Sequence, residues 1–303
     1  MSSLLKNCIF LCTVLTVLFC QIDTSAARDF KDDGELQLDY FLKLVKEPVP
    51  VKLPVEGIEN REDILFCTGN SLPAQSNNRA AERMLRGDYD KAKELLISDM
   101  PHSMLFLPYQ YNIGLCYYHL NDRARSRLHL TKASQLVPEY FLTYIQLGNL
   151  DSFEGNDDAA IYNYRKALKL NPKHLNALVL VGDIYFKRSQ IEAASKYYEL
   201  VLTIDPLFPN ALLGKGKVLF YKEQYYKAYQ LLKMVSTKKE YDKSLHYYFG
   251  ECAYKLQDYQ AAYDHYTKLL EFKSDRFFIT TSLKLIEHKQ ELAKRFVTQL
   301  EEE

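Results

Sequence analysis

The chain has 303 residues with 39 basic and 39 acidic side chains, so its formal net charge is zero. This balance gives no reason to expect nucleic acid as a partner, because proteins that bind a phosphate backbone usually carry an excess of lysine and arginine. Hydrophobic residues make up 47% of the chain, which is enough to build a sizeable core.

Residues 1–27 have the pattern of a secretory signal peptide. Lys6 precedes an apolar run from Ile9 to Phe19, and small residues close the segment around Ala27. The apolar run is shorter than the roughly 20 residues that favour a membrane-spanning helix. We therefore expect export and cleavage near Ala26 or Ala27.

Two alternatives remain open for this segment. Cys20 could carry a lipid after cleavage, which would resemble bacterial lipoproteins, although Phe19 stands where that family prefers a small residue. The segment could also stay attached as an uncleaved membrane anchor. All three interpretations place the protein in the periplasm or the cell envelope.

Residues 28–72 form an N-terminal extension without the periodicity of the following segment. Residues 35–46 predict a short amphipathic helix, and Pro48, Pro50 and Pro54 favour extended chain after it. The simpler interpretation is a linker with a capping helix. The alternative is that this segment docks on the array that follows and competes with its partners.

Residues 73–276 contain a 34-residue repeat, which usually indicates a stacked helical array. Three residue types keep this period. They are glycine (Gly114, Gly148, Gly182, Gly216 and Gly250), alanine (Ala160, Ala194, Ala228 and Ala262) and proline (Pro138, Pro172 and Pro206).

Each repeat is predicted to be two helices joined by a tight turn. Between residues 141 and 174, apolar residues recur at helical spacing on both sides of a break at Gly155. Gly155 is expected to end the first helix, and Asn156 or Asp157 to cap the second. Ser189 is the corresponding cap expected in the next repeat.

Small residues at fixed positions predict close packing of the two helices in each repeat. Two helices approach closely only where no bulky side chain intervenes, so each glycine is expected to face an alanine of the second helix. Tyr164, Tyr198 and Tyr266 are expected to fill the space beside these contacts.

The pattern resembles the tetratricopeptide repeat family, which has small residues at positions 8, 20 and 27, an aromatic at 24 and proline at 32. Residues 141–174 match best, through Gly148, Ala160, Tyr164, Ala167 and Pro172. The resemblance implies an all-α fold, a right-handed solenoid of about six helix-pair repeats beginning at residues 73, 107, 141, 175, 209 and 243. Its end would need a cap.

Residues 277–303 are the predicted C-terminal capping helix and acidic tail. Ile279, Leu283 and Ile286 form one apolar stripe, while residues 287–291 begin a polar stretch. The last three glutamates, residues 301–303, are expected to be a solvated tail.

The array would also separate the cysteines of the mature chain. Cys116 and Cys252 stand 136 residues, or four repeats, apart. Because packed helices are about 8 to 10 Å apart, these thiols would lie beyond disulfide reach. Buried, unpaired thiols are expected, and Cys67 remains a candidate for pairing between molecules.

In the tetratricopeptide repeat family, positions 2, 5, 9, 12 and 13 of each first helix line the concave groove. The resemblance gives these ligand-groove candidates: Tyr111, Tyr118, His119, Asn149, Phe153, Asp183, Phe186, Lys187, Lys217, Phe220, Tyr221, Tyr247, Glu251, Tyr254 and Lys255. Aromatic rings with mixed charges suit a peptide or a partner helix. Alternatively, position 12 packs between neighbouring helices.

No motif indicates catalysis, a cofactor or a metal site. The seven histidines lack the HExxH spacing, and no paired CxxC is present. We predict a non-enzymatic scaffold that binds another protein, with no nucleic acid and with membrane contact only through the N-terminal segment. One alternative is an accessory subunit that binds envelope glycan or polymer through the same aromatics, and another is a chiefly structural array.

Overall fold

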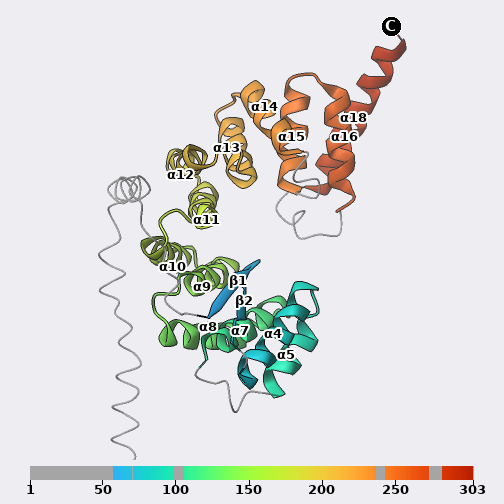
Figure 1. Ribbon diagram of the computed structural model, residues 1–303. Coiled ribbons are helices and arrows are strands. Elements are labelled where there is room, and N and C mark those ends of the chain that lie inside the picture. The colour runs from blue at the N-terminus through green and yellow to red at the C-terminus, as the bar shows by residue number, and fades with distance from the viewer. Residues whose placement is uncertain (1–56, 70, 99–105, 237–242, 273–281, 303) are drawn as a thin grey trace, which may run out of the picture. The chain divides into compact units, whose positions relative to one another are not determined.

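A computed structural model describes residues 57–69, 71–98, 106–236, 243–272 and 282–302 (Figure 1). The predicted signal segment, Cys20 and the helix expected at 35–46 lie outside these ranges. Within them, a β-hairpin precedes thirteen helices. The predicted all-α repeat fold is confirmed, and the hairpin is an addition that the sequence pattern did not predict.

The helices form six consecutive pairs followed by a single helix. The pairs are α4 (Leu72–Leu85) with α5 (Tyr89–Ser98), α7 (Leu107–His119) with α8 (Arg123–Leu136), α9 (Phe141–Phe153) with α10 (Asp157–Leu170), α11 (Leu175–Lys187) with α12 (Ile191–Ile204), α13 (Pro209–Tyr221) with α14 (Tyr225–Ser236), and α15 (Lys243–Lys255) with α16 (Tyr259–Leu270). The last helix is α18 (Leu283–Glu302), and the hairpin consists of β1 (Ile58–Arg61) and β2 (Ile64–Cys67).

The turn inside each repeat has one fixed backbone geometry. One residue in each turn has a positive φ, and these residues are again 34 apart: Gly87, Asn121, Gly155, Ser189, Glu223 and Gln257. In the second repeat, the Asn121 amide donates to Tyr118 O and the Asp122 amide donates to Tyr117 O. These two bonds satisfy the last carbonyls of the helix in the manner of a Schellman motif.

The expectation that Ser189 caps a helix is wrong. Ser189 occupies the left-handed position of the turn with φ 59°, and Gln190 is the residue that precedes α12. Asn156 does precede α10, but its side chain makes no capping hydrogen bond. Side-chain caps occur where aspartate follows the left-handed residue, since Asp122 accepts from Arg125 N and Asp258 accepts from Ala261 N.

The periodic glycines touch an aromatic or leucine side chain of the paired helix, and not the alanine that we expected. A Cβ added to Gly148 would lie 2.5 Å from Cε1 of Tyr164, which is closer than van der Waals contact permits. Gly182 and Gly250 face Tyr198 and Tyr266 in the same way. The remaining pairs are Gly114 with Leu130 and Gly216 with Leu232.

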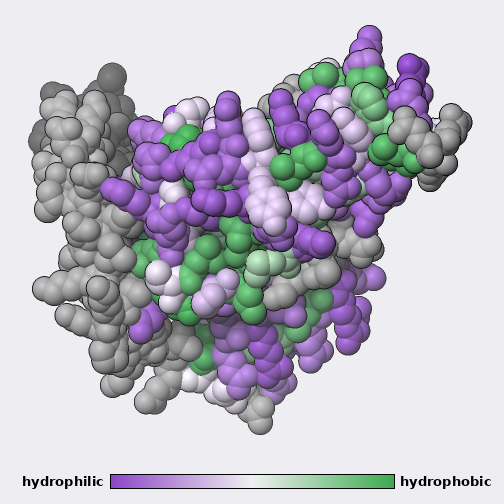
Figure 2. Space-filling view, turned by 90° about the horizontal axis from the view of Figure 1, so that it is seen from above, coloured by the Kyte–Doolittle hydropathy of each residue, from purple (hydrophilic) through white to green (hydrophobic). Residues whose placement is uncertain are grey.

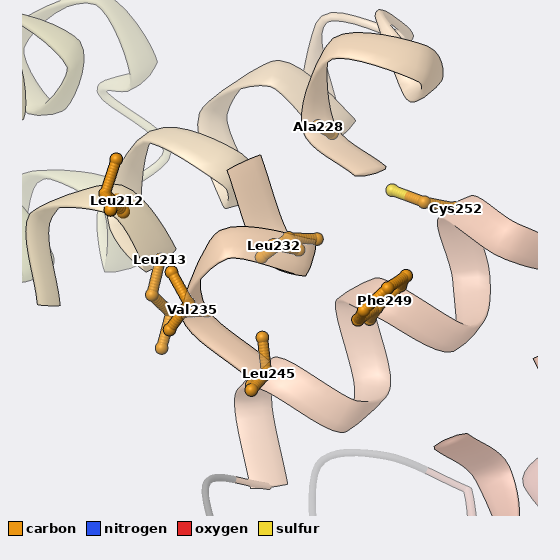
Figure 3. Packing of buried hydrophobic residues seen from close by; sticks show 8 residues of the cluster. All are labelled: Leu212, Leu213, Ala228, Leu232, Val235, Leu245, Phe249 and Cys252. Carbon is orange, nitrogen blue, oxygen red and sulfur yellow. The ribbon is translucent and has the colours of Figure 1, made fainter. Parts of the chain in front are cut away.

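The alanines of the second helices are fully buried in the same layer, and include Ala160, Ala194, Ala228 and Ala262. Neighbouring repeats then share a core. Figure 3 shows one such cluster, in which Leu213 from α13, Leu232 from α14 and Phe249 from α15 point toward one another. Each repeat therefore buries its apolar face against the next one.

Helix α18 covers the end of the array, as the sequence suggested, but its polar stretch is not simply solvated. Ile286 and Ala293 are fully buried in a cluster with Tyr266. Lys289 and Gln290, from the stretch expected to face solvent, bind Glu251 and Thr267. Ile279 lies outside the described residues.

The left-handed turn position gives a stability test. Glu223→Gly should raise the free energy of unfolding by about 0.5 to 1 kcal/mol, because the relief of left-handed strain outweighs the extra freedom of the unfolded chain. Glu94→Gly, the same change at an exposed position inside α5, should lower it by about 1 kcal/mol. Thermal unfolding of both variants tests this, and a destabilised Glu223→Gly would contradict the assignment.

Candidate functional site

Strand β2 of the hairpin lies against the first helices of repeats one and two, where amide side chains bind its backbone. Asn112 of α7 accepts from Leu65 N at 3.0 Å and donates to Leu65 O at 2.7 Å. Asn78 of α4 accepts from Cys67 N and donates to Cys67 O, both at 2.7 Å. Asn77 adds a bond to Leu65 O at 2.8 Å.

The spacing of these contacts follows from strand geometry. In the hairpin register, Leu65 and Cys67 have their N–H and C=O groups directed away from β1. Asn78 and Asn112 occupy position 6 of successive repeats and bind Cys67 and Leu65, respectively. A step of one repeat along the array therefore corresponds to two residues along the strand. Asn78 and Asn112 bind only backbone atoms of the strand, so their part of the recognition does not depend on the bound sequence, whereas Asn77 also contacts the Cys67 sulfur.

The four residues of β2 are buried without alternation, since each is below 9% exposed. A strand that is covered on both faces loses the usual inside and outside pattern. Helices α4 and α7 pack against β2, and β1 pairs with the edge of β2 that the asparagine side chains do not bind. The hairpin thus occupies the inner face of the first two repeats.

Beyond the hairpin, the inner face is open from repeat three to the beginning of α15 in repeat six. A cavity of about 430 Å³ lies there. We call it the open groove, and its polar lining residues are Asp63, Gln146, Asn149, His174, Asn176, Asp183, Asn210, Lys217 and Ser244. Apolar side chains such as Ile145, Val179 and Leu213 form part of its floor.

The charged groups of the open groove are mostly paired. Asp183 accepts from the hydroxyl of Tyr198 at 2.7 Å and lies 3.5 Å from the Lys217 ammonium. His174 accepts from Ala177 N through Nδ1, so its neutral ring carries the proton on Nε2. Burial lowers the pKa of His174, which keeps the ring neutral at pH 7.

Three of the predicted groove residues, Asn149, Asp183 and Lys217, line the open groove. Their neighbours at position 12 belong to an aromatic cluster at repeats four to six. Phe186 meets Tyr221 edge to face at 5.3 Å, and Phe220 meets Tyr248 in the same way at 5.4 Å. Tyr221 remains 57% exposed, so the cluster offers an accessible aromatic edge.

Four of the five predicted groove residues at position 13 make contacts between repeats, which is a different role from the one that the resemblance implied. His119 stacks on Tyr89, the Arg123 guanidinium lies 3.7 Å above the ring of Phe153, and the Lys187 ammonium binds Asp157 at 2.8 Å. In each case the partner is position 17 of the preceding repeat. Lys255 faces the Tyr225 ring in the same arrangement. Tyr118 lies beside this row, with its ring against His119.

Two predicted groove residues are buried and cannot meet a ligand directly. Tyr111 is fully buried against Tyr140, and burial raises its pKa well above the ordinary value. Glu251 is 5% exposed, because the Lys289 ammonium of α18 contacts both of its carboxylate oxygens at 2.6 and 2.7 Å.

The C-terminal helix also covers the inner face of the last repeat. Tyr247 and Tyr254, both predicted groove residues, pack against the buried cluster that contains Ile286 and Ala293. The polar pattern of residues 287–291 did not predict this contact, because two of its five side chains, Lys289 and Gln290, bind the array. The hairpin and α18 therefore close the two ends and leave the open groove between them.

Sequence reasoning missed the amides that define the groove. Asn77, Asn78, Asn112 and Gln146 stand at positions 5 and 6, and Asn176 and Asn210 stand at position 2 of their repeats. The available signal was the recurrence of asparagine and glutamine on first helices.

The three cysteines in the described ranges are buried and free. Burial raises the pKa of the Cys67 thiol to about 11, and the amide of Asn77 lies 3.4 Å from its sulfur. Because the thiolate is the reactive form, the structure argues against pairing of Cys67 between molecules. Cys116 and Cys252 have pKa values raised to about 12 for the same reason.

The part of the chain that the structure describes has neither a cluster of metal ligands nor a membrane-spanning helix. In this part of the chain, no group of three or more His, Cys, Asp or Glu side chains could hold a metal ion. The helices assigned here also lack the combination of length and apolar character needed to cross a bilayer.

Comparison with protein families gives two matches. Residues 142–174 match the model of the tetratricopeptide repeat, and residues 187–269 match the model of subunit 3 of the anaphase-promoting complex, or cyclosome. A search of curated proteins finds no match.

Among solved structures, the chain is similar to PilW, a type IV pilus biogenesis factor, with TM-score 0.58, 18% identity and coverage of 72% of this chain and 99% of that one. It is similar to pilF of Pseudomonas aeruginosa, with TM-score 0.59, 13% identity and coverage of 68% and 93%. A chain of the APC/C hetero-tetramer Cut9-Hcn1 gives TM-score 0.62 and 18% identity over 74% of this chain and 45% of that one. Identities this low establish the shared fold alone.

The ion pair that joins α18 to the array gives a second stability test. Lys289→Ala should lower the free energy of unfolding by about 3 kcal/mol, because it leaves the Glu251 carboxylate buried without a cation. Adding Glu251→Gln should restore part of this loss. Denaturant unfolding of the single and double variants measures the coupling, and additive effects would show that the pair is not the main contact.

Proposed function

Because this chain is an array of tetratricopeptide repeats, we propose that it is a non-enzymatic scaffold that binds an extended segment of another protein in the open groove. The observation that carries this proposal is the chain's own strand β2. An extended segment is already bound on the inner face of the array, through two-way hydrogen bonds from Asn78 and Asn112 to its backbone.

The open groove continues the same chemistry toward the C-terminus. Gln146 occupies position 6 of the third repeat, one repeat after Asn112. Asn176 and Asn210 follow on the next two repeats, and Asn210 Nδ2 donates to Asn176 Oδ1 at 3.3 Å. Amides of this kind offer both a donor and an acceptor, which is what the backbone of an extended peptide requires.

The aromatic cluster also supports a peptide rather than a glycan. Phe186, Tyr221, Phe220 and Tyr248 contact one another edge to face at angles of 72° to 85°. A sugar ring stacks best on a flat aromatic surface, whereas these rings stand at steep angles to one another and form no flat surface. Side chains of a peptide fit the angled walls between such rings. On the face drawn in Figure 2, hydrophobic patches lie among hydrophilic side chains.

We place the scaffold in the cell envelope on the strength of residues 1–27. The charged start, the apolar run and the small residues near Ala27 support export, and the neutral charge of the remaining chain is compatible with a partner of either sign.

A double substitution in the open groove tests the binding proposal. Randomised 12-residue peptides selected on the wild-type chain should lose about tenfold in affinity on Asn176→Ala with Asn210→Ala, since each amide contributes about one hydrogen bond to the peptide backbone. Gln230→Ala removes an exposed amide on α14, which lies off the groove, and should leave affinity unchanged. Fluorescence anisotropy measures both.

Failure to select any peptide would contradict the proposal, as would equal losses in the two variants. Binding of envelope oligosaccharides that depends on Tyr221 would instead support the glycan alternative.

The N-terminal residue of the protein purified from its native source tests the location. Mass spectrometry should find an unmodified chain that begins at Ala27 or Arg28. A lipid on Cys20 would make the scaffold membrane-tethered. A chain that keeps residues 1–26 would contradict cleavage.

A further inference from the structure

The turn between β1 and β2 has an unusual sequence for its geometry. Glu62 and Asp63 both have positive φ, at 52° and 63°. A two-residue hairpin turn with this backbone is usually built from asparagine, aspartate and glycine, because most other side chains are strained in the left-handed region. Glu62 is therefore the less usual residue of the turn, while the backbone of Asp63 is one that aspartate tolerates.

Asp63 stands at the entrance of the open groove. It lines the cavity together with Gln146, Asn149 and His174, whereas Glu62 does not. Its carboxylate is solvent-accessible and adds a negative charge that acts on His174 and on Tyr140. The hairpin thus places an acid beside the position where an extended peptide would start to follow the array.

No cation in the described ranges neutralises this carboxylate. Arg61, the nearest basic residue in sequence, is bound to Glu59 at 2.7 Å and lies over the ring of Phe66. Lys217, a cation of the open groove, faces Asp183. His174 adds no positive charge, because burial lowers its pKa and keeps the ring neutral at pH 7. Asp63 is therefore the uncompensated charge of the open groove.

We infer that Asp63 determines specificity in the open groove by recognising a lysine or arginine side chain of the bound extended peptide. This inference rests on the proposed function, because it names the partner class of the same site. The amides bind the peptide backbone, which every sequence shares, so a side-chain preference needs a separate group. An acceptor carboxylate selects a basic side chain through a charge-assisted hydrogen bond.

Peptide libraries of fixed composition test this inference with the full chain. Three sets of nine-residue peptides carry lysine, glutamine or glutamate at one fixed position, with the other positions randomised. The fixed position differs from one synthesis to the next, so each lysine library has a glutamine and a glutamate library that match it. The wild-type chain should prefer the best lysine library to the matching glutamate library by about fivefold, the range of a partly exposed ion pair. Asp63→Asn should abolish this preference and retain binding of the glutamine library.

A matched control is available in the same turn. Glu62→Gln removes an equal charge one residue away, outside the cavity lining, and should keep the preference for lysine. Asp63→Lys should reverse it toward glutamate. Because asparagine tolerates the left-handed conformation, Asp63→Asn should unfold at the same temperature as the wild type or a higher one, so a lost preference would not reflect lost structure.

Equal binding of the three libraries by the wild-type chain would overturn this inference and leave the proposed function standing. A preference for lysine that survives Asp63→Asn would overturn it as well. Absence of binding to all three libraries would overturn the proposed function and this inference together.

Discussion

The close approach of the two helices in each repeat is the contact on which the structure depends. In five of the six described repeats it is made by a glycine of the first helix against a tyrosine or leucine 16 residues later, as Gly148 is with Tyr164. The large side chain needs the space that a Cβ would fill, so the pair acts as one unit. In three repeats the tyrosine hydroxyl then donates to position 9 of the first helix, as Tyr198 does to Asp183. A packing contact inside the repeat thereby orients a polar group on the inner face.

The inner face is closed at both ends by segments of the chain itself. At the N-terminal end, β2 satisfies the amides of Asn78 and Asn112. At the C-terminal end, Lys289 of α18 neutralises Glu251. A terminal repeat would otherwise expose apolar surface, so both closures follow from the requirement for caps. They also limit the region available to a partner, which is why the open groove spans only the middle repeats.

The amides and the charges of the groove have separable roles. Amide side chains bind an extended backbone without regard to sequence, as the contacts to Leu65 show. Charged groups add preference, but pairing within the array removes most of them, as in the Lys187 contact with Asp157. The number of charged residues on the first helices is therefore a poor guide to the specificity of the groove. The unpaired carboxylate of Asp63 lies on the hairpin, outside the repeats.

The sequence by itself determined the repeat architecture, because a 34-residue period in glycine, alanine and proline coincides with apolar residues at helical spacing on both sides of a turn. It also determined that Cys116 and Cys252 are buried and unpaired. Only the tertiary structure decided which predicted groove residues are accessible. Tyr111 and Glu251 have the right positions within their repeats, yet the interior around Tyr140 and helix α18 bury them. Periodicity describes what each repeat shares with the others, whereas the hairpin and α18 occur once and bind through contacts between residues far apart in sequence. Such contacts leave no period in the sequence from which they could be read.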